Sequence, residues 1–185
     1  MTSRTPSNQV AAVALAEDSG EADRPPAAGE AAGVIVDVID ATGRLARDDA
    51  AWLGQWAGRA ALMAGGAGEV RVRVVGDAEM AEAHRRYSGV EGTTDVLTFD
   101  LRPDPSAGGA LDTDILICLD EADRQAGDRG HPVRRELLLY ILHGVLHCLG
   151  HDDHSEAGYR AMHAREDEIL RALGVGDTFG GSGSS

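Results

Sequence analysis

The segment HGVLHCLGHDDH, from His143 to His154, places four of the chain's seven histidines and two aspartates within twelve residues. His143 and His147 lie four residues apart inside the apolar stretch RRELLLYILHGVLHCLG. On a helix with about 3.6 residues per turn, they stand one turn apart on the same face. Two imidazoles at this spacing can bind one metal ion. Zinc is the usual ion for nitrogen ligands, with nickel, cobalt or manganese as alternatives.

The sequence after the second histidine predicts that the chain turns back toward this face. Gly150 follows the expected helix end, where a glycine can adopt the left-handed conformation that reverses the chain. In the metzincin pattern H-E-x-x-H-x-x-G-x-x-H the third ligand lies ten residues after the first. Here that position is Asp153, and His154 follows it. Spacing favours Asp153 and ligand type favours His154, so both are candidates, whereas His151 is expected to point away.

Gly144 occupies the position at which zinc peptidases of the H-E-x-x-H type carry a glutamate general base. A glycine inside a helix costs about 1 kcal/mol relative to alanine, which indicates a close backbone approach or access to the metal. Peptide hydrolysis by the usual route therefore lacks its base. Attack of a metal-bound water on a phosphodiester needs less help, because the ion lowers the pKa of the water and stabilises the developing charge.

The composition indicates one folded domain of ordinary size. The chain has 185 residues, 43% of them hydrophobic, and a formal net charge of −14, which argues against non-specific coating of nucleic acid. Residues 1–32 are rich in Ala, Glu, Ser, Pro and Gly, and this composition predicts a disordered extension. We expect the folded domain to cover residues 33–175 and residues 176–185 to form a flexible tail. No apolar run approaches a membrane span, and two isolated cysteines suggest buried thiols in a reducing compartment. We therefore expect a cytoplasmic protein.

Hydrophobic periodicity predicts an α/β (α+β) domain in which about four strands form a mixed sheet packed with four to five helices, the metal site lying on a central buried helix. Asp77 is expected to cap the N-terminus of its helix, and His163 to be exposed on the last helix. The predicted strands cover residues 34–40, 69–75, 95–101 and 114–120, and the predicted helices residues 48–64, 77–87, 121–128, 132–148 and 155–173.

The histidine segment resembles the H-G-x-L-H-L-x-G-x-D-H signature of the YbeY family of bacterial rRNA maturation factors. TTDVLTFDL (residues 93–101) is similar to the family's P-T-D-V-L-S-F stretch, and DTDILICLDEADRQA (residues 112–126) to its G-D-I-x-I-S strand and the Q-A helix that follows. Glu136, seven residues before His143, also matches a glutamate that is usual in the family. Together these segments cover about residues 34 to 175, in family order.

The resemblance implies a zinc-dependent, single-strand-specific endoribonuclease that processes the 3′ end of 16S rRNA in ribosome biogenesis. It implies that His143 and His147 are catalytic residues that bind one Zn²⁺, and it places the family's third histidine ligand at Asp153. The implied partners are single-stranded RNA, as rRNA, and the small ribosomal subunit, with no DNA and no membrane. The other hypotheses are a metallopeptidase-like hydrolase and a non-catalytic, zinc-stabilised, ribosome-associated factor.

The resemblance also points to residues that contact RNA. Many relatives have an arginine, thought to act at the phosphate, where this chain has Ser88. Arg85 or Arg86 is a candidate to replace it from the preceding helix. Thr94 is a candidate to line a substrate groove beside the metal.

Activity is expected to disappear below about pH 6, because an imidazole must be neutral to bind a metal ion. The measurement is the rate of RNA cleavage as a function of pH. A rate that stays level down to about pH 5, more than one unit below the ordinary histidine pKa, would contradict a metal ion held by histidines.

Overall fold

The computed structural model describes residues 33–105 and 108–176. The expectations for residues 1–32, and for all of the C-terminal tail except residue 176, concern residues outside these ranges. The described elements, in chain order, are β1 (Val34–Asp40), α1 (Arg47–Met63), β2 (Gly68–Val75), α2 (Asp77–Ser88), β3 (Val96–Asp100), β4 (Leu111–Cys118), α3 (Leu119–Arg129), α4 (Val133–Cys148) and α5 (Glu156–Ala172). None of the described helices is long and apolar enough to cross a membrane.

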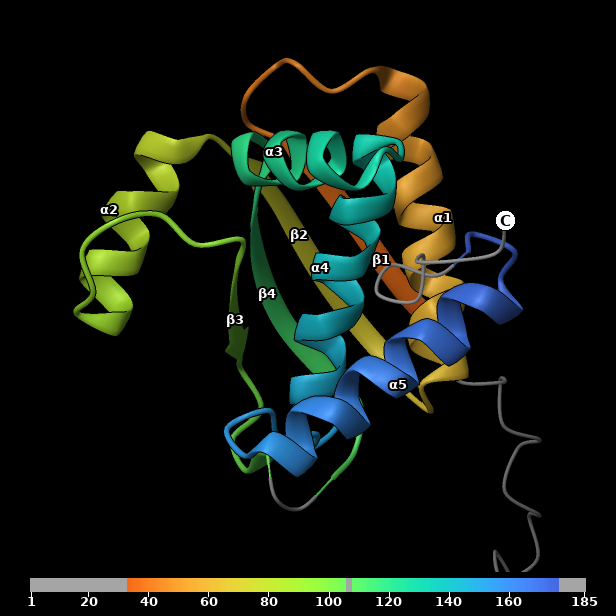
Figure 1. Cartoon of the computed structure of the whole chain (residues 1–185). Helices are drawn as coiled ribbons and strands as arrows, with labels where there is room; N and C mark the ends of the chain where they lie inside the picture. Colours follow the sequence, from red (N-terminus) through yellow and green to blue (C-terminus); the bar gives the residue numbers. More distant parts are fainter. Residues whose placement is uncertain (1–32, 106–107, 177–185) are drawn as a thin grey trace, which may run out of the picture. The chain divides into compact units, whose positions relative to one another are not determined.

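The four strands form one mixed sheet in the order β1-β2-β4-β3. β1, β2 and β4 run parallel, and β3 pairs with β4 in the antiparallel direction at the edge of the sheet. Helices α1, α4 and α5 lie over one face of this sheet, and α3 crosses near its end (Figure 1). The predicted fold class is therefore confirmed: an α/β domain with a four-stranded mixed sheet and five helices.

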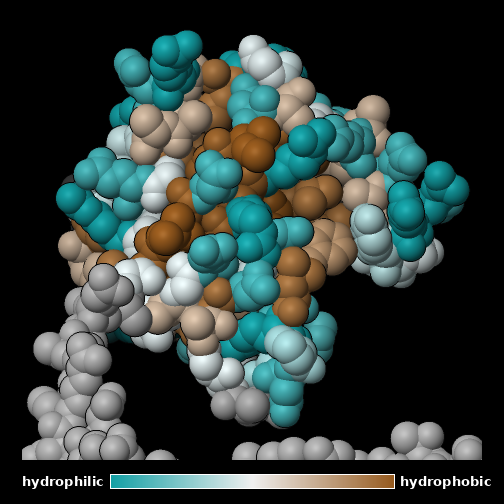
Figure 2. Space-filling view, turned by 180° about the vertical axis from the view of Figure 1, so that it is seen from behind, coloured by the Kyte–Doolittle hydropathy of each residue, from teal (hydrophilic) through white to brown (hydrophobic). Residues whose placement is uncertain are grey.

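The other side of the sheet carries both apolar and charged side chains. Ile35 and Ile39 of β1 are exposed there, and Arg71 of β2 forms ion pairs with Asp112 and Asp114 of β4. Seen from behind, this side of the molecule shows hydrophobic side chains with hydrophilic ones between them (Figure 2). The alternation of half-buried and exposed residues along β1 follows from this arrangement, because successive strand residues point to opposite faces.

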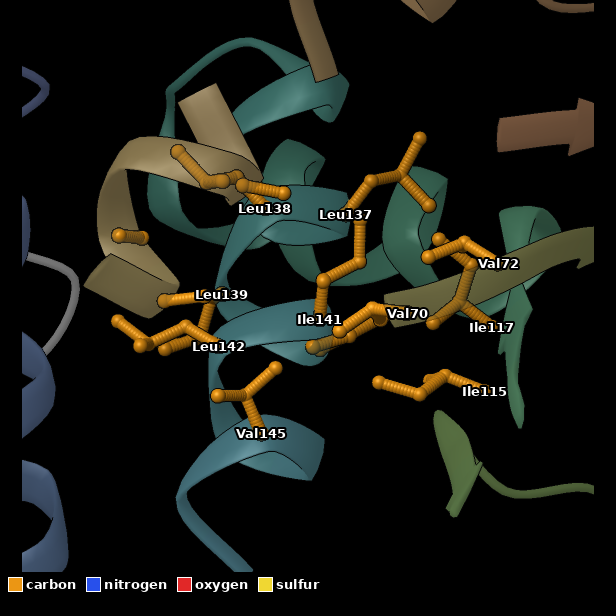
Figure 3. Close-up of a cluster of buried hydrophobic side chains, with 14 of the residues drawn as sticks. Val70, Val72, Ile115, Ile117, Leu137, Leu138, Leu139, Ile141, Leu142 and Val145 are labelled. Atoms are coloured by element: carbon orange, nitrogen blue, oxygen red, sulfur yellow. The ribbon is translucent and has the colours of Figure 1, made fainter. Parts of the chain in front are cut away.

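Helix α4 forms the centre of the hydrophobic core. Leu137 and Ile141 face the sheet, whereas Leu138 and Leu142 extend from the opposite side of the helix toward α1 (Figure 3). The strand residues of this core are Val70, Val72, Ile115 and Ile117. Each fully buried side chain of this size contributes about 1.5–3 kcal/mol of transfer free energy. Burial on several sides therefore fixes the rotation of α4 about its axis, and with it the direction of His143 and His147.

The predicted bounds of one strand and one predicted helix cap are wrong. The strand expected over residues 114–120 covers Leu111–Cys118, and Leu119 already begins α3. The apolar run ILICL continues through this junction, so periodicity alone could not locate it. Asp77 does not cap α2, because Gly76 is the N-cap residue. Instead, the Asp120 carboxylate accepts a hydrogen bond from the Asp77 backbone N–H at 2.7 Å, so the first turn of α2 is capped from another segment.

Gly144 marks a close approach between α4 and the sheet. A Cβ atom at this position would lie 2.6 Å from Thr98 Oγ1 of β3 and 3.0 Å from Ile115 Cδ1 of β4. Both distances are shorter than ordinary van der Waals contact. The close backbone approach expected from the sequence is therefore confirmed, and it leaves no room at this position for the glutamate of a zinc peptidase.

We predict that Gly144→Ala lowers the free energy of unfolding by about 1–3 kcal/mol, because the added methyl overpacks the contact with Thr98. Gly127→Ala is the matched control: it lies inside α3, and a Cβ there would meet nothing within 4 Å. This control should be more stable than the wild type by about 0.5–1 kcal/mol, from helix propensity alone. Urea denaturation measures both, and equal effects of the two substitutions would contradict the steric explanation.

Candidate metal centre

The last two turns of α4 bring the two predicted histidines together. The Nε2 atoms of His143 and His147 lie 3.1 Å apart. Their rings are nearly perpendicular, at 86°. Their side chains are 21% and 31% exposed, so both imidazoles reach the surface of the core at the open end of the helix.

The end of α4 reverses the chain as the sequence predicts. Gly150 has a φ of 91°, in the left-handed region. Its N–H donates to the His147 carbonyl, and the N–H of His151 donates to the Leu146 carbonyl, each at 3.0 Å. This pair of bonds is the Schellman motif that closes a helix C-terminus. The turn directs the next residues back toward the histidines.

Asp153 is the third member of the cluster. Its Oδ2 lies 3.7 Å from Nε2 of His143 and 3.7 Å from Nε2 of His147. Among the described residues, these three form a group whose potential ligand atoms lie within 4.8 Å of one another. The side chain of His154 is 90% exposed and lies near Asp152 and Asp153 instead. The geometry thus favours Asp153 over His154, the two candidates that the sequence leaves open.

Hydrogen bonds at the other ring nitrogens fix the tautomers of both histidines. His147 Nδ1 lies 3.2 Å from the His151 carbonyl oxygen, which can only accept, so Nδ1 carries the proton. His143 Nδ1 lies 2.8 Å from Glu166 Oε1, a carboxylate that accepts in the same way. In the neutral rings, both Nε2 atoms therefore present lone pairs to the same position as Asp153 Oδ2. Three converging acceptors without a donor between them suit a cation.

The spacing of these three atoms fits a small transition-metal ion. Ligands held about 2.0–2.1 Å from a tetrahedral zinc ion are about 3.3 Å apart. The three separations here are 3.1, 3.7 and 3.7 Å, close to that value on either side. Two imidazole nitrogens and one carboxylate oxygen are also a ligand set that zinc accepts.

Glu166 of α5 is the residue of this site that sequence reasoning missed. Its side chain is fully buried, and its two oxygens lie 2.8 Å from His143 Nδ1 and 2.6 Å from His163 Nδ1. The expectation that His163 is exposed is wrong: its side chain is 18% exposed, because the bond to Glu166 draws it inward. The available signal in the sequence was its spacing: Glu166 falls at helical spacing from Met162, Ile169 and Leu170, the apolar residues on the buried face of α5.

The environment of His143 raises its pKa above the ordinary value. Burial acts in the opposite direction, but the hydrogen bond to Glu166 and the negative charges of Glu166, Asp95 and Asp153 together prevail. Protons therefore compete with a metal ion for His143 more strongly than they would at an ordinary histidine.

Two cavities, of about 530 and 440 Å³, meet at this cluster. Thr94, Asp95 and His143 line both of them. Contact of Thr94 with a substrate stays a prediction. Arg85 and Arg86 are exposed in the last turn of α2 and are not among the described residues that line either cavity. Contact of these two arginines with RNA stays a prediction.

The fold and the site define an α/β domain with a candidate mononuclear metal centre at the end of a buried helix, beside a groove. A protein-family model described as Endoribonuclease YbeY matches residues 47–174. The chain therefore belongs to the YbeY endoribonuclease family, a family of nuclease hydrolases, and the resemblance noted from the sequence is confirmed.

Curated relatives and a solved structure agree with this assignment. The chain is 42% identical over 118 residues to Endoribonuclease YbeY of Moorella thermoacetica, covering 60% of this chain and 76% of the relative. It is 38% identical over 111 residues to that of Methylibium petroleiphilum, covering 60% and 72%. The solution structure of TM1509 from Thermotoga maritima, 20% identical, superposes with a TM-score of 0.51 over 81% of this chain and 99% of the other. This last likeness supports the fold alone.

We predict that Glu166→Gln weakens zinc binding about 10–100-fold, because the carboxylate no longer holds the His143 ring and its tautomer. The measurement is competition with a chromophoric chelator at pH 7, with circular dichroism to verify folding. Glu168→Gln is the control: it removes the same charge from α5 at an exposed position that pairs with Arg165. Equal zinc affinities for the two variants would contradict the orienting role of Glu166.

Proposed function

We propose that this chain is a zinc-dependent, single-strand-specific endoribonuclease of the cytoplasm. We propose further that it acts on rRNA of the small ribosomal subunit and matures the 3′ end of 16S rRNA. Its membership of the YbeY family supports the nuclease activity. The rRNA substrate, the ribosomal partner, the location and the identity of the ion are parts of the proposal that follow the family resemblance.

The observation that carries the proposal is the convergence of His143 Nε2, His147 Nε2 and Asp153 Oδ2 where two cavities meet. Three protein ligands leave a fourth position for water or substrate, as catalytic zinc sites do, whereas structural sites use four protein ligands. When bound, the ion would lower the pKa of a water and stabilise charge on the phosphoryl oxygens.

The residues around the ligands have positioning roles in this proposal. Glu166 and the His151 carbonyl hold the two imidazoles in the tautomer that leaves Nε2 unprotonated. Thr94 donates its hydroxyl to Asp95 Oδ1, which also accepts the N–H of Val96. Asp95 is thereby fixed on the wall shared by both cavities.

The two rival functions have less support. A peptidase of the H-E-x-x-H type needs a glutamate at position 144, where a Cβ atom would already clash with Thr98. A structural zinc site would use both Asp153 and His154 together with the two helical histidines. The His154 side chain is 90% exposed and belongs to a separate group with Asp152 and Asp153, not to the group that contains His143 and His147. Among the described residues, the geometry thus favours an ion with an open coordination position.

We predict that freshly purified protein cleaves an end-labelled single-stranded RNA, and that a chelator or His147→Ala abolishes the cleavage. Asp153→Ala should reduce zinc affinity and kcat/KM by at least about tenfold, because a ligand is lost. His154→Ala, the matched control one residue away, should retain both. If all preparations cleave alike, the nuclease is a contaminant. If His154→Ala and not Asp153→Ala removes zinc, the assignment of the third ligand is wrong.

A further inference from the structure

A third cavity, of about 280 Å³, is lined by residues of α1, of the start of α4 and of the segment that follows α5. Its lining includes Trp52, Trp56, Arg134 and Arg135, and no acidic residue among those described. None of the candidate metal ligands lines it, so this cavity is separate from the metal centre. In a chain with a net charge of −14, a cavity lined by two indoles and two guanidinium groups indicates a ligand that is both aromatic and anionic.

The two tryptophans form one wall of this cavity. Trp52 and Trp56 lie one turn apart on α1, and their ring centroids are 5.6 Å apart at an interplanar angle of 35°. Both side chains pack against the hydrophobic core and are only partly buried, so each indole is anchored by the core and still lines the cavity. Aromatic rings fixed in this way can stack with a nucleobase, and such stacking tolerates any base.

The two arginines differ in the partners that their charges already have. Arg134 pairs with Asp49 at 3.2 Å, and its guanidinium carbon lies 4.9 Å from the centre of the Trp52 ring. Arg135 is half-buried, and no residue in the described part of the chain forms an ion pair with it. Its Nε atom is buried and has no hydrogen-bond partner there. Buried polar groups without a partner are rare, and a guanidinium is always charged, so Arg135 indicates that an anion binds in this cavity.

We propose that this cavity is a second RNA-binding site, in which a nucleobase stacks on Trp52 and Trp56 and the adjoining phosphate binds the guanidinium of Arg135. The inference rests on the proposed nuclease function and extends it to binding of the strand away from the metal centre. A nucleotide combines the aromatic ring and the negative charge that these side chains can bind. Small-ligand sites usually have roughly 300–1,000 Å³, so a cavity of about 280 Å³ suits a single nucleotide.

The second site lies on the same helix as the metal centre. Arg135 and His143 are eight residues apart on α4, which separates them by about 12 Å along the helix axis. Eight residues are slightly more than two turns, so the two side chains leave the helix in directions about 80° apart. A strand that extends a few nucleotides beyond the metal centre can therefore reach the cavity, whereas a very short substrate cannot. The site contributes to binding of the strand and takes no part in the chemical step.

Tryptophan fluorescence measures occupation of this site directly. The chain has two tryptophans and both line the cavity, so the intrinsic emission reports on this site and not on the metal centre. The purified full-length protein is mixed with a single-stranded oligoribonucleotide, and the emission is recorded in a stopped-flow instrument before cleavage begins. Stacking of a base on an indole should quench the emission.

Two other polyanions serve as controls for this measurement. An abasic oligoribonucleotide of the same length and charge should quench far less, because it has phosphates and no bases. Polyglutamate should not quench. Unchanged emission when anisotropy shows that the protein is saturated with RNA would overturn the proposal. Equal quenching by the abasic strand would also overturn it, and equal quenching by polyglutamate would show a site for acidic polypeptides instead.

Arg135→Gln removes the charge of the site without leaving a buried carboxylate unpaired, because no described residue forms an ion pair with Arg135. The Kd of the oligoribonucleotide should rise about tenfold. The slope of log Kd against log salt should be smaller by about 0.7, the value for one lost phosphate contact on a single strand. The KM for a long RNA should rise with kcat unchanged, because the lost contact is the same before and during the reaction.

Arg73→Gln is the charge-matched control: Arg73 lies on the sheet, pairs with Glu79 and does not line this cavity. It should bind RNA with the wild-type Kd and salt slope. If Arg135→Gln also matched the wild type in Kd, slope and tryptophan quenching while the wild type cleaves RNA, the nuclease function would stand and the second site would fail. If the wild type did not cleave RNA but showed quenching that depends on Arg135, the second site would stand and the proposed nuclease function would fail.

Discussion

Three acceptor atoms that point their lone pairs at one position repel one another, and the fold of this chain is arranged to keep them there. His143 and His147 are fixed by a helix whose sides are buried against the sheet and against α1. Asp153 returns to them because Gly150 ends that helix in a left-handed turn. These contacts prevent the three side chains from moving apart. The site therefore has to rearrange less when a cation binds, so the candidate metal site is preorganised.

Two buried carboxylates fix side chains in and around the cluster. Glu166 joins α5 to His143, and Glu136 joins the start of α4 to Arg129, and both glutamates are fully buried. An isolated buried charge is costly, so each is tolerated because its partner is held close. In both cases the partner is a side chain that lines the larger cavity. The same two interactions therefore stabilise the packing of the helices and fix the orientation of side chains that line this cavity.

Much of this architecture follows from local sequence patterns. The alternation in EVRVRVV, the i and i+4 spacing of His143 and His147, and the glycine at 150 each depend on neighbours within a few residues, and each was predicted. Boundaries were less certain where an apolar run crosses from strand to helix, as at Leu119. These errors arise because the hydrophobic periodicity of a sequence indicates which residues are buried and indicates the backbone conformation only indirectly.

The contacts that the sequence could not predict are those between distant segments. Glu166 lies 23 residues after His143. Its spacing with Met162, Ile169 and Leu170 places it on the buried face of α5, but this local pattern does not identify His143 as its partner. Asp153 and His154 are adjacent in the turn after α4, so a shift of one residue would exchange their positions. The spacing of the motif favours Asp153 as the third ligand, whereas ligand type favours His154. Only the direction in which the turn after Gly150 presents each side chain separates them.

A strongly acidic chain that acts on RNA needs positive charge concentrated at the site where the RNA binds. The net charge of −14 opposes binding of a polyanion at long range, so little affinity can come from the surface as a whole. Much of the acidity near the site has other uses: Asp153 and Glu166 serve the candidate metal centre directly or through a histidine, and Asp95 is held by Thr94. The zinc ion proposed for the metal centre would supply positive charge at one such site. Because the candidate ligand His143 lines both cavities, RNA would have to enter them to reach that charge, and an exposed single strand does so more readily than a stiff duplex.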